Sequence, residues 1–183
     1  MHEKLMQEAI AYGEQVNPIW PFSAMIVDKE GRVLVKATDC AHISPLFHAE
    51  SLAVHTLIEE HPDRKFDDLT LVTTAEPDPL SQSAVQWAAV THNIPIRTIV
   101  YGCPIAKIQE IWPFGIDISA KEINERSSGK PITFIGPVLE EGCYRLFLQA
   151  KERQKQVESD HPGRKVLSKN REDFVTLTLP APG

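Results

Sequence analysis

Two apolar segments without strict alternation constrain this chain more than any other feature. Residues 68–74 and 97–101 are dense in leucine, isoleucine, valine and threonine, and each is followed by a segment with helical periodicity. Strands of this kind are buried on both faces, which is typical of parallel strands between two layers of helices. The pattern therefore predicts an α/β fold with helices on both sides of a sheet.

The rest of the chain supplies the other elements of such a fold. An amphipathic helix is expected up to about Asn17, followed by a hairpin of strands 22–27 and 32–36 that turns at Gly31. Further elements are expected as helices at 44–59, 78–93, 104–111 and 138–154 and a strand at 131–135. The helix at 44–59 would begin at Ser44-Pro45, and the helix after Asp78 would bury Leu80, Ala84, Trp87 and Ala88. This order predicts a three-layer α/β/α sandwich with a mixed, mostly parallel five-stranded sheet, in one domain over residues 1–155.

Residues 156–183 are expected to form a polar extension with one short strand. The stretch from Phe174 to Leu179 has strand propensity and alternates apolar with polar residues. An apolar strand needs a partner, so it would join either an edge of its own sheet or a second subunit.

Charge and composition exclude several classes of function. With 19 basic and 25 acidic residues the net charge is −6, and no basic cluster is long enough to bind duplex nucleic acid. Three cysteines without C-x-x-C spacing exclude a disulfide framework and a Cys-rich structural metal site. No apolar stretch is long enough for a membrane span, so we expect no membrane partner and a cytoplasmic location.

Two short motifs contain the candidate catalytic and metal-binding residues. His48-Ala49-Glu50 stands at one expected helix, and Glu76-Pro77-Asp78-Pro79-Leu80-Ser81 stands at the next. This arrangement resembles the cytidine deaminase-like superfamily, in particular its guanine deaminase and tRNA adenosine deaminase branch. Residues 21–24 and 135–143 also resemble that family. The resemblance implies the fold described above, a pocket for a small nucleobase-like ligand, and a homodimer.

The resemblance also implies a zinc site. His48 and the residues at positions 78 and 81 would hold the metal, and Glu50 would transfer protons as the catalytic residue. The family has cysteines at the last two ligand positions, whereas this chain has Asp78 and Ser81. A carboxylate and a neutral hydroxyl bind zinc more weakly than two thiolates. We therefore expect either no cofactor or a weakly bound divalent metal on His48 and Asp78, with Ser81 as a weak donor.

A second interpretation of the same residues needs no metal. Asp78 is a preferred N-cap, Pro79 is a preferred first helical residue, and Ser81 lies in the first turn. We favour this capping interpretation. Cys40, in the loop before His48, is not expected to bind metal, and His55 lies two helical turns from His48, too far to share an ion with it.

Four further residues are candidates for the ligand pocket: Asp39, Phe47, Trp112 and Phe114. Asp39 lies near the position where the resemblance implies an asparagine that binds the base. Trp112 and Phe114 follow a short helix and are placed to stack on a base. The same four-residue sequence occurs twice, at Ile19-Trp20-Pro21-Phe22 and at Ile111-Trp112-Pro113-Phe114. We interpret this repetition as coincidence because the flanking sequences are dissimilar.

These observations leave three functions open. The first is a deaminase-fold protein with a degraded zinc site that lacks ordinary zinc-dependent deaminase activity and acts by binding a ligand or through its dimer surface or C-terminal arm. The second is an active hydrolytic nucleobase or nucleoside deaminase with an unusual metal site on His48 and Asp78 and with Glu50 as proton shuttle. The third is a different reaction of the same three residues without zinc. The two replaced cysteines favour the first.

Overall fold

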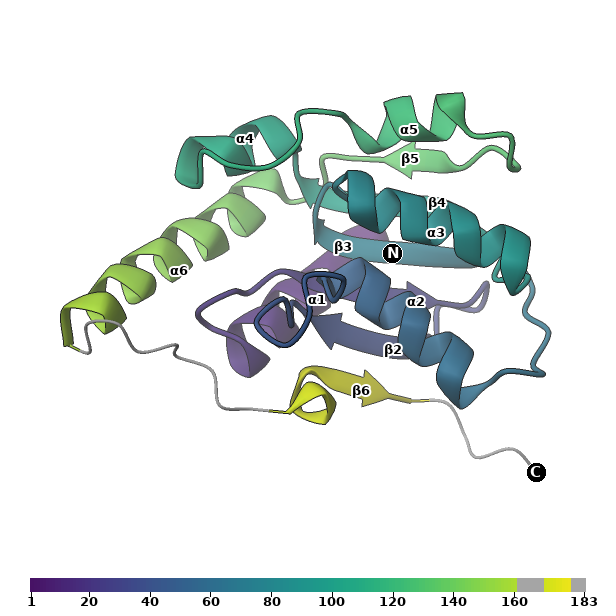
Figure 1. Ribbon diagram of the computed structural model, residues 1–183, viewed down its shortest axis with the longest axis horizontal. Coiled ribbons are helices and arrows are strands. Elements are labelled where there is room, and N and C mark those ends of the chain that lie inside the picture. Colours follow the sequence, from purple (N-terminus) through teal and green to yellow (C-terminus); the bar gives the residue numbers. More distant parts are fainter. Residues whose placement is uncertain (161–169, 179–183) are drawn as a thin grey trace.

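A mixed six-stranded sheet runs through the middle of the computed structural model, which describes residues 1–160 and 170–178 (Figure 1). The strand order is β5-β4-β3-β1-β2-β6. The strands are β1 (Ser23–Val27), β2 (Val33–Thr38), β3 (Leu69–Ala75), β4 (Ile96–Cys103), β5 (Thr133–Ile135) and β6 (Val175–Leu177). The helices are α1 (His2–Val16), α2 (Ala49–Glu60), α3 (Pro79–Thr91), α4 (Ile105–Ile111), α5 (Ala120–Arg126) and α6 (Glu140–Asp160), with a 3-10 turn at Arg171–Phe174.

The predicted α/β/α architecture with a mixed sheet is confirmed. β3, β4 and β5 are parallel, while β1 is antiparallel to β2 and to β3. The sheet has six strands rather than the expected five because β6 pairs with β2. With that addition three of the five neighbouring pairs are antiparallel, so the parallel share is smaller than predicted.

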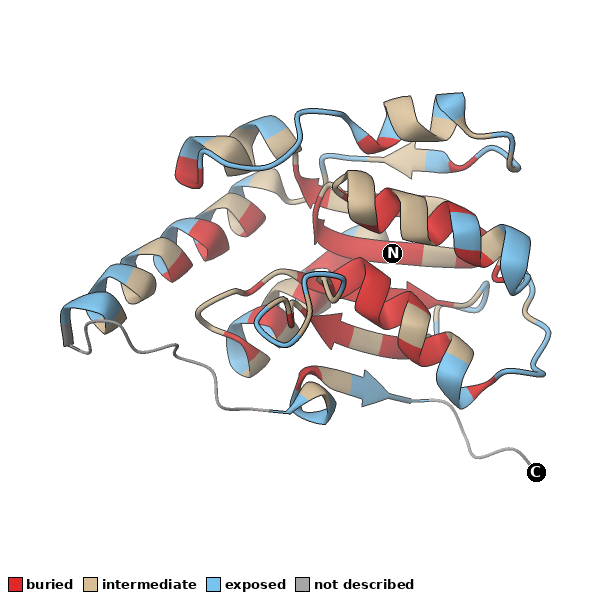
Figure 2. Cartoon of the chain, in the orientation of Figure 1, coloured by how far each residue is buried: buried red, intermediate tan, exposed pale blue. Residues whose placement is uncertain are grey.

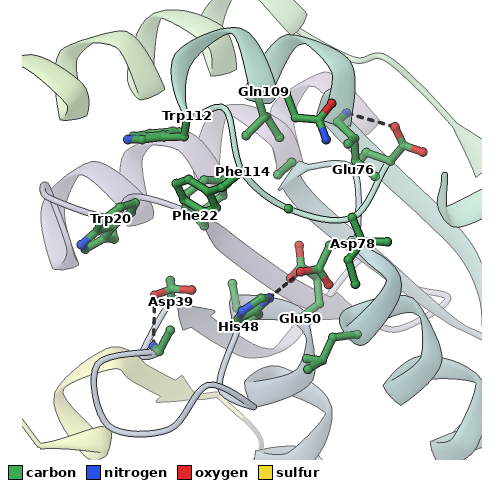
Figure 3. Close-up of a pocket in the computed structure, with 18 of the residues that line it drawn as sticks. Trp20, Phe22, Asp39, His48, Glu50, Glu76, Asp78, Gln109, Trp112 and Phe114 are labelled. Atoms are coloured by element: carbon green, nitrogen blue, oxygen red, sulfur yellow. Dashed lines mark hydrogen bonds and ion pairs between the residues drawn. The ribbon is translucent and has the colours of Figure 1, made fainter. Parts of the chain in front are cut away.

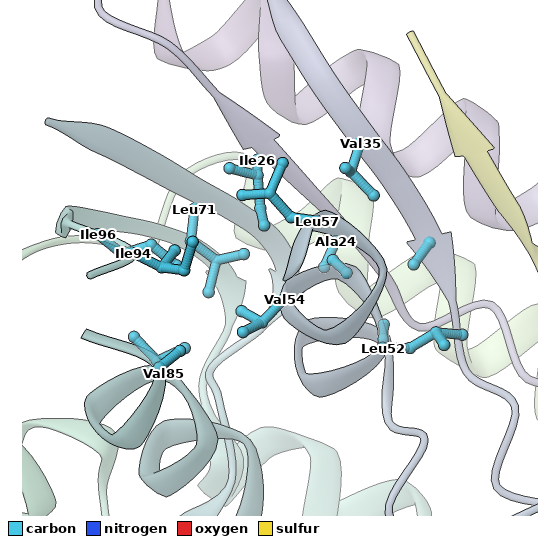
Figure 4. Packing of buried hydrophobic residues seen from close by; sticks show 14 of the residues in the cluster. Ala24, Ile26, Val35, Leu52, Val54, Leu57, Leu71, Val85, Ile94 and Ile96 are labelled. Carbon is cyan, nitrogen blue, oxygen red and sulfur yellow. The ribbon is translucent and has the colours of Figure 1, made fainter. Parts of the chain in front are cut away.

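Alternation along the strands divides the interior into two cores. In β1, Ala24 and Ile26 pack against the face covered by α2 and α3, whereas Met25 and Val27 pack against α1 and α6. Buried residues accordingly fill both sides of the central strands (Figure 2). On the first face, Val54 of α2 and other aliphatic side chains pack over the sheet (Figure 4).

A glycine sets how closely α6 approaches the sheet. A Cβ atom built on Gly102 of β4 would lie 2.2 Å from Sγ of Cys143 and 2.7 Å from the carbonyl oxygen of Thr74. Only glycine fits at this position. The strand β4 continues through Gly102 to Cys103, beyond the range 97–101 that the sequence predicted.

The predicted helix start at Ser44-Pro45 is wrong. α2 begins at Ala49, and His48 is its N-cap. The preceding residues form a turn closed by backbone hydrogen bonds from the Cys40 amide to the Phe47 carbonyl (2.8 Å) and from the Phe47 amide to the Ser44 carbonyl (2.9 Å). Serine and proline also favour turns, and here they belong to a turn rather than to the helix. As a result His48 lies at the N-terminus of α2 and not within the helix.

Three further details differ from expectation. Trp87 is 66% exposed, because α3 buries Val85 and Ala88 and turns Trp87 to solvent. α5 was not expected, and α6 extends beyond Gln154 to Asp160. The other elements occur close to their predicted ranges, including the hairpin, in which Gly31 has a φ of 82°. None of the described helices combines the length and the apolar character needed to cross a membrane.

The C-terminal strand pairs with its own sheet. β6 is antiparallel to β2, and Phe174 just before it is fully buried in the core under α2. Arg171 donates to a carboxylate oxygen of Glu59 at 2.9 Å and so fixes the segment to α2. Of the two alternatives for this strand, addition to the chain's own edge is therefore the one observed; Leu179 lies outside the described residues.

Phe174 should carry most of the anchoring energy of this segment. We expect Phe174→Ala to lower the free energy of unfolding by about 3 kcal/mol, because it removes a fully buried aromatic ring and leaves a cavity. The matched control is Leu177→Ala in the same segment, whose side chain is 37% exposed and whose loss should cost less than about 1 kcal/mol. Chemical denaturation measures both. Equal effects of the two substitutions would contradict the packing described here.

Candidate functional site

The functional candidates gather around one large cavity at an edge of the sheet. The cavity has a volume of about 840 Å³ and is lined by residues from the ends of β2 and β3, from the starts of α2 and α3, and from α4, α6 and the segment after α4 (Figure 3). Carboxyl ends of strands are the usual place for ligands in α/β sheets. Sequence and topology thus agree on the location of the site.

Two helix N-termini meet at this cavity. α2 begins after the turn that ends in His48, and α3 begins directly after β3, with Asp78 as its N-cap. The Oδ1 atom of Asp78 accepts a hydrogen bond from the Ser81 amide at 2.7 Å, and Pro79 occupies the first helical position. Asp78, Pro79 and Ser81 therefore occupy the capping positions that the second interpretation gave them.

His48, Asp78, Ser81 and Glu50 form a continuous polar network. Nδ1 of His48 lies 2.7 Å from Oδ2 of Asp78. The Ser81 hydroxyl donates to Oε2 of Glu50 at 3.0 Å, and the Thr73 hydroxyl of β3 donates to Oε1 of the same carboxylate at 2.5 Å. The structure thus brings together all four residues that the motifs singled out, and it adds Thr73, which carried no signal in the sequence.

The ion pair shifts the pKa values of both His48 and Asp78. The hydrogen bond to Asp78 raises the pKa of His48 from 6.5 to about 9 and outweighs the opposing effect of burial. Burial alone would raise the pKa of Asp78, but hydrogen bonds from His48 and from the Ser81 amide lower it. At neutral pH the pair is therefore an imidazolium and a carboxylate.

Glu50 is the most deeply buried acid of the site, with a residue exposure of 5%. Burial raises the pKa of its carboxyl group, although the hydrogen bond from Thr73 opposes this effect. A buried carboxyl group with a raised pKa is suited to hold and release a proton.

The donors around His48 are one imidazole, one carboxylate and one neutral hydroxyl, a weaker set for zinc than one that includes two thiolates. Nδ1 of His48 faces Asp78, and the Ser81 hydroxyl donates to Glu50. No three histidine, cysteine, aspartate or glutamate side chains among residues 1–160 and 170–178 are arranged to hold a metal. Cys40 is buried within the core on the α2 side, and His55 pairs with Glu59 and not with His48.

Three of the four predicted pocket residues line the cavity. Asp39 accepts a hydrogen bond from the Ala41 amide at 3.1 Å, and burial raises the pKa of its carboxyl group. Trp112 lines the wall and is otherwise buried, while Phe114 is 67% exposed at the rim. Phe47 does not line the cavity. It stacks on His55 with ring centroids 5.6 Å apart and packs against the core on the α2 side, because the turn before His48 directs it inward.

An aromatic wall was missed by the sequence analysis. Trp20 and Phe22 both pack on Trp112, with centroid distances of 5.5 and 5.6 Å. Gln154 of α6 accepts a hydrogen bond from the Trp112 indole at 3.0 Å and donates to the Ile19 carbonyl at 2.7 Å. The two Ile-Trp-Pro-Phe segments therefore lie side by side.

Glu76 was also not among the residues predicted for the site. Its two carboxylate oxygens accept hydrogen bonds from the Ile105 amide at 3.2 Å and from the Ala120 amide at 3.1 Å. It thereby joins the starts of α4 and α5 to the end of β3, which fixes the segment that forms one side of the cavity.

Comparison with known proteins identifies a family and a shared fold. The sequence model of the cytidine and deoxycytidylate deaminase zinc-binding region matches residues 1–102. No curated protein matches the chain.

Among solved structures, a variant of NE0047 in complex with 8-azaguanine is 18% identical with a TM-score of 0.69, covering 83% of this chain and 86% of its own. A guanine deaminase from Nitrosomonas europaea is 18% identical with a TM-score of 0.61, covering 81% and 80%. A tRNA:A34 deaminase is 20% identical with a TM-score of 0.55, covering 77% and 94%. At these identities the structures show a shared fold.

The His48 ring should titrate far above its ordinary range. We expect an NMR midpoint near pH 9, returning toward 6.5 in Asp78→Asn, which keeps a capping oxygen but removes the charge. Because the folded pKa exceeds the unfolded one, the pair stabilises the fold fully below about pH 6.5 and loses this effect as the pH rises through 9. Since the side chains are 33% and 37% exposed, the effect should be about 1 kcal/mol.

The matched control is Glu59→Gln. It removes the carboxylate beside His55, 3.2 Å away, and should leave the His48 midpoint unchanged. A wild-type His48 midpoint near 6.5 would contradict the ion pair.

Proposed function

The chain belongs to the family of the cytidine and deoxycytidylate deaminase zinc-binding region, and on that premise we propose that it binds a nucleobase-like ligand without ordinary zinc-dependent deaminase activity. The single observation that carries this proposal is the continuous network of His48, Asp78, Ser81 and Glu50. In a zinc site the same positions would present a neutral imidazole and anionic ligands to one ion.

Protonation explains why the network opposes metal binding. A histidine must be neutral to bind a metal, but the ion pair with Asp78 raises the pKa of His48 to about 9. A metal would therefore have to displace a proton from His48 and break its ion pair with Asp78. In return the metal would gain one imidazole, one carboxylate and one neutral hydroxyl but no thiolate, which supports a degraded zinc site.

The cavity itself supports ligand binding. Its volume of about 840 Å³ lies in the range of small-molecule sites, and its wall carries the rings of Trp20, Phe22 and Trp112. Flat heterocycles stack favourably on such rings. Structures of NE0047 contain 8-azaguanine and 2,6-diaminopurine, which are ligands of this shape. In this chain the rings would hold the plane of the ligand, and Asp39 would accept a hydrogen bond from its edge.

One observation favours the alternative of an active deaminase. Glu50 is buried, and its raised pKa suits the proton transfer that deamination requires. In that alternative His48 and Asp78 would hold a metal after losing their ion pair. Ammonia release from guanine, cytosine, adenine and their nucleosides separates the two functions, and we expect none above the rate without protein. The homodimer and the cytoplasmic location stay predictions.

Metal content tests the proposal directly. Protein dialysed against zinc should contain far less than one zinc per chain by elemental analysis. The double variant Asp78→Cys with Ser81→Cys should gain about one, because both positions already converge on His48 and Glu50. Adding His48→Ala to this variant should remove the gained metal.

Two results would count against this reading of the site. Near-stoichiometric zinc in the unmodified chain that is lost in His48→Ala would show a working metal site. A double variant that keeps its circular dichroism spectrum but stays free of zinc would show that positions 78 and 81 are not aligned with the family's ligands.

A further inference from the structure

The charges that line the cavity are almost all negative. Its lining includes two histidines, His42 and His48, but no lysine or arginine among the described residues. Its acidic members are Asp39, Glu50, Glu76, Asp78 and Glu158. This imbalance is larger than that of the whole chain, in which 19 basic residues accompany 25 acidic ones.

Most of these carboxylates are engaged inside the protein. Glu50 accepts from two hydroxyls, Glu76 accepts from two backbone amides, and Asp78 pairs with His48 and caps α3. Asp39 differs from them. Its Oδ1 atom accepts from the Ala41 amide, whereas its Oδ2 atom has no hydrogen-bond partner in the part of the chain that the structure describes. One carboxylate oxygen is therefore left for a ligand.

Asp39 lies next to the aromatic wall, where its amide donates to the Phe22 carbonyl at 3.0 Å. In Figure 3 the side chains of Asp39 and His48 lie below the rings of Trp20, Phe22 and Trp112, and all of them line the cavity. A flat ligand that stacks on the rings would present its edge to Asp39. Aromatic faces and carboxylates both attract positive charge, and tryptophan does so most strongly among the aromatic residues.

Basic side chains near the cavity are directed elsewhere. Lys107 of α4 pairs with Glu140 at 2.8 Å, and Arg153 of α6 pairs with Glu14 at 2.9 Å. His48, which lines the cavity, is paired with Asp78 at 2.7 Å. No described lysine or arginine is therefore placed to neutralise a phosphate in the cavity. A phosphorylated ligand would bring further negative charge next to unpaired carboxylate oxygen, which is unfavourable.

We propose that the cavity selects a planar heterocycle that carries a positive charge, held between the Trp20–Trp112 wall and Asp39, and that it excludes nucleotides. This inference rests on the proposed function and narrows its ligand class. It separates this chain from any relative that acts on a deoxycytidylate, whose phosphate would meet no lysine or arginine in this cavity.

A ligand series that varies charge on one ring system tests the proposal. The probes are 1-methyladenosine, which is cationic at neutral pH, neutral adenosine, and adenosine monophosphate. Calorimetry should show that 1-methyladenosine binds at least about tenfold more tightly than adenosine, the factor expected from one desolvated cation–aromatic contact. Adenosine monophosphate should bind more weakly than adenosine.

The substitution Asp39→Asn identifies the group responsible. It keeps an oxygen for the Ala41 amide but removes the charge, so it should weaken the binding of 1-methyladenosine more than that of adenosine and reduce the preference between them. A merely structural role of Asp39 would weaken both ligands equally. The matched control is Asp63→Asn, the same chemical change at an exposed residue outside the cavity, which should leave both affinities unchanged.

The outcomes distinguish this inference from the proposed function. Equal binding of 1-methyladenosine and adenosine, or tightest binding of adenosine monophosphate, overturns the charge selection and leaves nucleobase binding in place. If no nucleoside binds, benzamidine and its neutral isostere benzamide decide. Binding of benzamidine alone, lost in Asp39→Asn, supports charge selection and overturns the nucleobase ligand, whereas binding of neither probe overturns both.

Discussion

The pairing of Asp78 with His48 is the interaction on which the site depends. Each of these residues ends a loop and starts a helix, so their contact fixes the N-termini of α2 and α3 against each other at the edge of the sheet. The same Asp78 carboxylate also caps α3 through the Ser81 amide. The Asp78 side chain therefore caps α3 and also joins α3 to α2.

In the function that we propose, hydrogen bonds take the place of a metal as the link between the two helices. In zinc deaminases the ion ties a histidine on one helix to two cysteines on the next. Here Asp78 binds His48 directly, and Ser81 reaches Glu50 of the same first helix. These contacts join the starts of α2 and α3 without thiolates at positions 78 and 81. The family fold and the family reaction are therefore separable in physical terms.

Local signals in the sequence were enough for the architecture and for part of the site. The buried strands β3 and β4, the hairpin and the cap at Asp78 each follow from a few neighbouring residues. The start of α2 was misplaced because Ser44-Pro45 suits a helix start and a turn equally well, and backbone hydrogen bonds decide between them. Thr73, Trp20 and Gln154 reach the site only through long-range packing, which no periodicity encodes. Phe47 was misassigned for the same reason.

The chemistry of the cavity follows from what each of its two sides can offer. The aromatic side supplies area and π-electron density but no hydrogen-bond acceptor strong enough to orient an edge. The polar side supplies carboxylates. Protein donors hold both oxygens of Glu50, Glu76 and Asp78, but only one oxygen of Asp39. An ionised carboxylate accepts hydrogen bonds and cannot donate them. A ligand that satisfies both sides must therefore be flat and must present N–H groups to Asp39. A positively charged ring meets these conditions better than a neutral one, because the same charge is attracted by the rings and by the carboxylate.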